Sequence, residues 1–148
     1  MRDPPSGTVT HPPIDVKWIG GANFEAGRPG GPRIRIDGDA QTGPSPFDTL
    51  LAAIATCALV DVVTILEKQR TPAQALDVRV EANRVDSTPR RLASAILHFS
   101  ITAPGATAEK AGRAVELSVT RYCSVRSSLI AEAKVSWTVE LKAVQASP

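Results

Sequence analysis

Apolar and polar residues alternate along much of the chain, and a period of two is typical of half-buried β-strands. Residues 14–19 read IDVKWI, and residues 33–37 read RIRID with Ile34 and Ile36 on one face. The Gly20-Gly21 pair between the first two segments predicts a hairpin turn. The sequence therefore predicts strands at residues 14–19, 22–26, 33–37, 76–85, 92–101 and 134–144.

One segment has a different pattern, because residues 50–66 are apolar on nearly every side of a helix. Ser45 is a favoured N-cap, Pro46 fits the first helical position, and Asp48 places a negative charge in the first turn. Pro72 blocks continuation, so we expect the helix to end at about Arg70. A helix that is apolar all round is a buried central helix, and a chain of 148 residues has little to cover it with. We therefore expect a partner subunit to cover part of it.

The remaining pattern completes the predicted fold. Thr107 is the expected cap of a helix that runs to about Ser118, and residues 122–130 predict a short helical turn. Strands, a long helix, more strands, a helix and a last strand define an α+β fold with mostly antiparallel sheets around a central helix. We expect residues 1–13 to be a flexible lead-in and residues 14–148 to form a single domain.

Composition narrows the class of protein. There are 17 basic and 15 acidic residues, a net charge of +2, and six aromatic residues, which argues against a nucleic-acid partner. Residues 1–13 contain no apolar run, so no signal peptide is expected. The apolar stretch at residues 50–66 is short for a bilayer and contains Asp61, which is costly there. We expect a cytoplasmic protein without a membrane partner.

The two cysteines are the main candidates for chemistry. Cys57 is in the middle of the long helix, with Asp61 one turn later, where an acid must be paired or solvated. Cys123 stands just before Ser124, at the expected start of a short helix, where a thiolate is stabilised. Each cysteine taken alone can be a small buried apolar residue. Two thiols that meet in space can instead alternate between dithiol and disulfide.

Other chemistries have less support in the sequence. Arg28, between glycines in the loop at residues 27–32, is a candidate cation for a thiolate, although a loop arginine can equally be solvated. His11 and His98 are far apart, so we expect no metal site. The glycine-rich loops lack GxGxxG and the P-loop lysine, no GxSxG is present, and no cofactor is expected.

Two segments carry a resemblance to a known family. Residues 43–70, GPSPFDTLLAAIATCALVDVVTILEKQR, resemble the cysteine helix of the OsmC/Ohr family, the osmotically induced and organic-hydroperoxide-resistance proteins. Residues 114–129, AVELSVTRYCSVRSSL, resemble the second cysteine segment of that family. The likeness extends from about residue 14 to residue 144.

The resemblance implies an intertwined homodimer and thiol peroxidase chemistry. By this resemblance Cys57 is the thiolate that attacks an organic hydroperoxide, and Cys123 condenses with the resulting sulfenic acid. An external dithiol then reduces the disulfide, and Arg28 matches the family arginine by its place in the loop. Peroxidase members of the family carry a glutamate where this chain has Phe47, and here the acid follows at Asp48.

Two acids and two further functions complete the hypothesis. Asp48 and Asp61 are candidates to orient the site. A non-enzymatic dimer that binds a small apolar ligand is one alternative, which Phe47 favours. A redox sensor that uses the same two thiols with a protein partner is another.

Overall fold

The computed structural model describes residues 5–144, and these fall into two compact units divided between Thr49 and Leu50. The expected lead-in at residues 1–13 lies partly outside the described residues, and its described part, residues 5–13, contains no helix or strand. The flexibility of the lead-in stays a prediction, and so does the single domain at residues 14–148.

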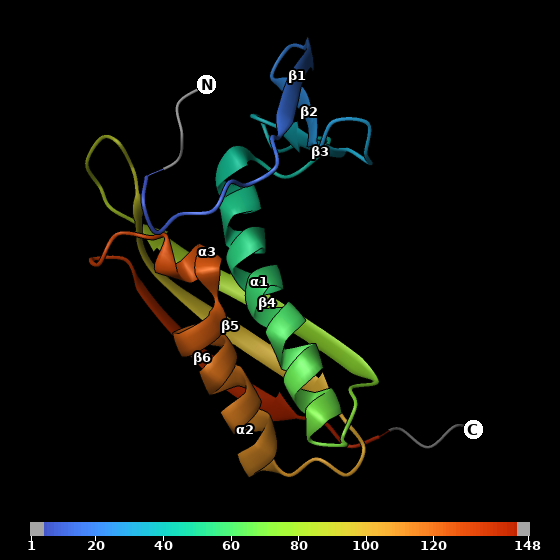
Figure 1. The fold of residues 1–148 in the computed structure, drawn as a ribbon. Coiled ribbons are helices and arrows are strands. Elements are labelled where there is room, and N and C mark those ends of the chain that lie inside the picture. Colours follow the sequence, from blue (N-terminus) through green and yellow to red (C-terminus); the bar gives the residue numbers. More distant parts are fainter. Residues whose placement is uncertain (1–4, 145–148) are drawn as a thin grey trace. The chain divides into compact units, whose positions relative to one another are not determined.

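The first unit contains a three-stranded antiparallel sheet in the order β1-β2-β3 (Figure 1). Its strands are β1 (Asp15–Gly20), β2 (Asn23–Gly27) and β3 (Ile34–Asp37). Cross-strand partners lie on the same face, so Val16, Trp18 and their neighbours form an apolar face. Val16 is 64% exposed, Trp18 is 65% exposed and Ile34 is 56% exposed. One chain therefore leaves this apolar face largely uncovered.

The loop after β3 is organised by one buried carboxylate, that of Asp37. It accepts hydrogen bonds from the backbone N–H groups of Asp39 at 2.9 Å, Gln41 at 3.0 Å and Thr42 at 2.8 Å. These bonds, led by those from Thr42 and Asp39, lower the pKa of Asp37 to about 2. The carboxylate thus fixes the loop that leads toward the long helix.

The long helix α1 (Pro46–Lys68) begins where the sequence predicts. The Asp48 N–H donates to Ser45 Oγ at 3.0 Å, and the Ser45 N–H donates to Asp48 Oδ2 at 2.9 Å. This reciprocal pair is a capping box with aspartate as the acid. Its hydrogen bonds also lower the pKa of Asp48. The helix ends at Lys68, slightly before the predicted end at about Arg70.

Only one side of α1 is buried within the chain. Its fully buried residues follow helical spacing along that side, whereas Val60 is 66% exposed and Val63 is 39% exposed. By length and composition alone, α1 could cross a membrane. Within an apolar stretch of 18 residues of this helix, 28% is buried inside the chain. One chain therefore covers only one side of this apolar helix, which agrees with the expectation that a chain of this length has too little to cover it. The buried residues are Ile54, Ala55, Ala58, Val62 and Leu66.

The second unit contains a sheet in the order β4-β5-β6, and α1 and α2 run over one side of it in Figure 1. The strands are β4 (Ala75–Arg84), β5 (Leu92–Thr102) and β6 (Lys134–Leu141). β4 and β5 are antiparallel, but β5 and β6 are parallel. Three of the four strand pairings in the described residues are thus antiparallel, which agrees with the predicted α+β fold.

The crossover between the parallel strands carries three helical elements. They are α2 (Ala108–Leu117), the π-helix η1 (Ser118–Tyr122) and α3 (Ser124–Ser127). The N-cap of α2 is Thr107, as predicted, and its side chain accepts the Lys110 N–H. A parallel pair needs a crossover of about a dozen residues or more, and this segment supplies it.

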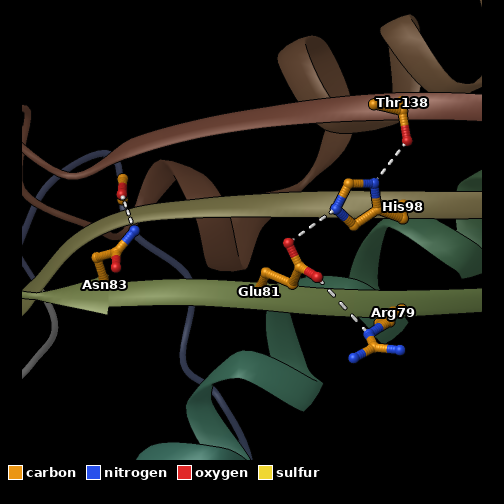
Figure 2. A network of polar contacts seen from close by, with 6 residues as sticks. Arg79, Glu81, Asn83, His98 and Thr138 are labelled. Carbon is orange, nitrogen blue, oxygen red and sulfur yellow. Dashed lines mark hydrogen bonds and ion pairs between the residues drawn. The ribbon is translucent and has the colours of Figure 1, made fainter.

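The two faces of the second sheet differ in polarity. Leu97, Phe99 and Ile101 of β5 are buried, whereas the opposite face carries the polar network of Figure 2. There His98 Nδ1 lies 2.8 Å from Thr138 Oγ1, and His98 Nε2 lies 3.4 Å from Glu81 Oε2. His98, a residue considered for metal binding, is thus held in a polar contact network on the outer face.

Candidate active site

Cys57 lies in the middle of α1, as the sequence predicts, and its side chain is half-buried. Its sulfur lies 3.8 Å from Ser124 Oγ, across 67 positions of the chain. The Cys123 side chain is near enough to lower the pKa of Cys57. The second unit alone therefore places the two cysteines near each other.

Cys123 is placed by the helical elements on either side of it. The π-helix η1 ends at Tyr122, and Cys123 is extended, with φ −70° and ψ 98°, before α3 begins. Its sulfur caps α3 by accepting the Arg126 N–H at 3.4 Å, and it lies 3.8 Å from the carbonyl oxygen of Ile54. Because Ile54 is about one helical turn before Cys57, this geometry holds Cys123 against the face of α1 that carries Cys57. π-Helices often occur at functional sites.

Both cysteines are free thiols, and the surroundings move their pKa values in opposite directions. Partial burial raises the pKa of Cys57, but hydrogen bonds from the Val125 N–H, the Cys123 side chain and Ser124 outweigh it. The pKa of Cys57 therefore lies below its ordinary value. A lowered pKa increases the thiolate fraction, and the thiolate is the nucleophile.

For the Cys123 thiol, the effects that raise the pKa outweigh those that lower it. Burial raises its pKa, the Arg126 N–H opposes this, and the hydrogen bond and negative charge of Cys57 raise the pKa further. Cys123 is only 1% exposed. The pair therefore consists of an accessible thiol that ionises readily and a buried thiol that keeps its proton.

The structure leaves the predicted role of Arg28 open. Arg28 belongs to the first unit, where its carbonyl oxygen accepts the Gly31 N–H at 3.0 Å and its side chain is exposed. A position of Arg28 beside Cys57 stays a prediction.

The two candidate acids have different surroundings. Asp48 is engaged in the capping box at the start of α1. Asp61 is half-buried, and within residues 5–144 its carboxylate has no hydrogen bond or ion pair. An orienting role for either acid stays a prediction.

Sequence reasoning did not select Ser124 as a functional residue. Its hydroxyl approaches Cys57, although the two residues are far apart in the chain. The available signal was its position directly after Cys123 at a helix start, where a hydroxyl next to one thiol can also reach a second. Within residues 5–144, no group of three or more His, Cys, Asp or Glu side chains is arranged to hold a metal ion.

Comparison with known proteins defines the class. The family model described as OsmC-like protein matches residues 37–138, so this chain belongs to the OsmC/Ohr family. The chain is 34% identical over 129 residues to protein YhfA of Escherichia coli K12, covering 86% of this chain and 96% of that protein.

Solved structures share the fold. An OsmC-like protein from Mycoplasma pneumoniae has a TM-score of 0.77 at 18% identity, over 90% of this chain and 99% of that one. An organic hydroperoxide resistance protein from Elizabethkingia anophelis has a TM-score of 0.65 at 16% identity, over 92% of this chain and 99% of that one. The family and the fold predicted from the sequence are thus confirmed.

Proposed function

We propose that this protein is a thiol peroxidase that reduces organic hydroperoxides with Cys57 and Cys123. The observation that carries the proposal is the proximity of two free thiols whose pKa values are shifted in opposite directions. The structural likeness to an organic hydroperoxide resistance protein supports the choice of substrate.

The first step uses the ionised thiol. The Cys57 thiolate attacks the terminal oxygen of the hydroperoxide, the O–O bond breaks, and Cys57 becomes a sulfenic acid. The leaving alkoxide takes a proton from solvent and departs as an alcohol. The half-buried position of Cys57 leaves its sulfur accessible to such a substrate.

The second step uses the protonated thiol. The Cys123 sulfur attacks the sulfenic sulfur of Cys57, an S–S bond forms, and the hydroxyl leaves as water with the Cys123 proton. An external dithiol then reduces the disulfide through a mixed disulfide and is itself oxidised. The proximity of Cys57 and Cys123, each of which shifts the pKa of the other, supports this step.

The apolar side chains around Cys57 support an organic substrate. Ala53 and Val60 lie within about one turn of Cys57 on α1, and Ala53 is half-buried whereas Val60 is exposed. An alkyl hydroperoxide can place its hydrocarbon part against such residues, whereas hydrogen peroxide gains nothing from them. We expect faster consumption of cumene hydroperoxide than of hydrogen peroxide.

Substitution of Cys57 tests the assignment. Cys57→Ser should abolish consumption of cumene hydroperoxide with dithiothreitol as reductant, whereas Thr56→Ser, on the adjacent exposed position of α1, should retain it. Cys123→Ser should still react once and accumulate a Cys57 sulfenic acid that dimedone traps. Full turnover by Cys57→Ser would overturn the proposal. An alkylation-inert Cys57 without peroxidase activity would favour the apolar-ligand function instead.

We also propose that the protein acts as a homodimer in the cytoplasm. The apolar face of the first sheet and the exposed side of α1, which includes Val60 and Val63, support a second copy as the cover. A central helix shared by two subunits also accounts for the long apolar stretch without a membrane.

A further inference from the structure

Three consecutive residues supply hydrogen bonds to the Cys57 sulfur. The backbone N–H of Val125, the side chain of Cys123, and both the hydroxyl and the backbone N–H of Ser124 contribute. Hydrogen bonds to an ionised acceptor are about twice as strong as those between neutral groups. This segment therefore favours the thiolate form of Cys57 over the thiol.

The hydroxyl of Ser124 differs from the other side-chain donor in one respect. Cys123 gives up its proton when the disulfide forms, whereas the Ser124 hydroxyl is not consumed in any step. In the thiol state of Cys57, either partner of the 3.8 Å contact can donate. Once Cys57 ionises, its sulfur has no proton, so Ser124 must be the donor.

The backbone around Ser124 holds this hydroxyl in place. Ser124 is the first residue of α3, directly after the cap formed by Cys123 and the Arg126 N–H. The carbonyl oxygen of Ser124 accepts the Ser128 N–H at 3.1 Å and the Ser128 hydroxyl at 2.8 Å. These bonds restrict the backbone at Ser124 and so limit where its side chain can reach.

We propose that Ser124 is a further functional residue of the peroxidase site, whose hydroxyl donates to the Cys57 thiolate and stabilises its charge throughout the reduced state. The inference rests on the proposed peroxidase function for its purpose, but the contact itself belongs to the second unit alone. Part of the stabilisation of the Cys57 thiolate then comes from a neutral donor, the Ser124 hydroxyl, which is next to Cys123 in the chain.

The test is the pH profile of Cys57 alkylation by iodoacetamide, followed by mass spectrometry of the Cys57 peptide. Loss of one hydrogen bond to a charged acceptor predicts an alkylation rate about tenfold lower for Ser124→Ala near neutral pH. The rates of the variant and the unmodified protein should converge above the ordinary thiol range, where Cys57 is ionised in both. Ser127→Ala is the matched control, because Ser127 is an exposed serine of the same helix.

A general disturbance of the structure would lower the rate at every pH rather than move the profile. Ser124→Thr keeps the hydroxyl and should restore most of the reactivity near neutral pH. The inference would be overturned if the pH profile did not shift in Ser124→Ala, or if it shifted by as much in Ser127→Ala.

Peroxide consumption separates this inference from the proposed function. If the alkylation profile shifts in Ser124→Ala but the unmodified protein consumes no hydroperoxide, the peroxidase function is contradicted and the donor role of Ser124 is supported. Peroxide consumption with no profile shift in Ser124→Ala would contradict the role of Ser124 alone.

Discussion

At the scale of single residues, the site depends on the difference between two identical functional groups. Cys57 is half-buried and receives hydrogen bonds, so its pKa falls, whereas burial raises the pKa of Cys123. Each effect reinforces the other, because a protonated Cys123 can donate to an ionised Cys57. The order of reaction follows from this difference, since the more readily ionised thiol reacts first.

The donor role of Cys123 gives a prediction of its own. In Cys123→Ser a hydroxyl can still donate to Cys57, whereas Cys123→Ala loses this one donor and keeps those of Ser124 and Val125. A hydrogen bond to a charged acceptor contributes about 1.5 kcal/mol, and about 1.4 kcal/mol is a factor of ten in the thiolate population. The alkylation rate of Cys57 near neutral pH should therefore be about tenfold lower in Cys123→Ala than in Cys123→Ser.

The pH dependence of the two rates separates the lost donor from the lost cap of α3. Serine is a good N-cap and alanine a poor one, so the alanine variant also loses the bond from the Arg126 N–H. A disturbed helix would keep the two rates apart at high pH, whereas a lost donor allows them to converge there. Equal rates at neutral pH would contradict the donor role of Cys123.

How much of the site the sequence predicts depends on the distance between its residues in the chain. Cys57 and Cys123 could be selected because cysteines are rare here and stand in recognisable helical contexts. Ser124 could not be selected, because it lies 67 positions from Cys57 in the chain and no repeating sequence pattern indicates their contact. The position of Asp48 in the first turn of the helix could be read from the sequence. The structure shows the local reason for it, which is the capping box with Ser45.

At the scale of elements, patterns with a local cause were predicted well. The six predicted strands all form, within a few residues at their ends, and the start of α1 follows from Ser45 and Pro46. The parallel pairing of β5 and β6 was not predicted, because alternation gives the faces of a strand but not its partner. The π-helix η1 was also missed, since one extra residue in a turn has no distinct hydrophobic period.

The loop after β3 yields a prediction about pH. The folded pKa of Asp37 is about 2, below the ordinary aspartate value of about 3.9 expected in the unfolded chain. The carboxylate therefore stabilises the fold above about pH 4, and this stabilisation is lost as the pH falls toward 2. Asp37→Asn should be less stable to urea at neutral pH, and the difference should narrow over that acid range.

Urea unfolding at fixed protein concentration, followed by tryptophan fluorescence, measures this difference, because Trp18 lies in the same unit as Asp37. Asp39→Asn is a suitable control, since the Asp39 side chain is exposed. A stability difference between Asp37→Asn and the unmodified protein that stays constant from neutral to acid pH would contradict the assignment.

At the scale of the whole molecule, the chain exposes more apolar surface than a single copy can explain. Val60 of α1 is 66% exposed, and Trp18 of the first sheet is 65% exposed. Extended apolar patches on a folded chain mark interaction surfaces. The length and composition of α1 would also suit a membrane span, and an experiment on its exposed side distinguishes a membrane from the proposed second copy.

A charge placed on the exposed side of α1 separates these possibilities. If a second copy covers Val60, Val60→Lys buries an unpaired charge in each subunit, which costs at least about 3 kcal/mol and weakens the dimer by about a hundredfold or more. Sedimentation velocity over a range of concentrations measures this change. Ile96→Lys is the matched control, because Ile96 is 37% exposed on the outer, polar face of the second sheet and should leave the dimer intact. A monomeric unmodified protein that binds lipid vesicles, and loses this binding in Val60→Lys, would instead assign the surface to a membrane.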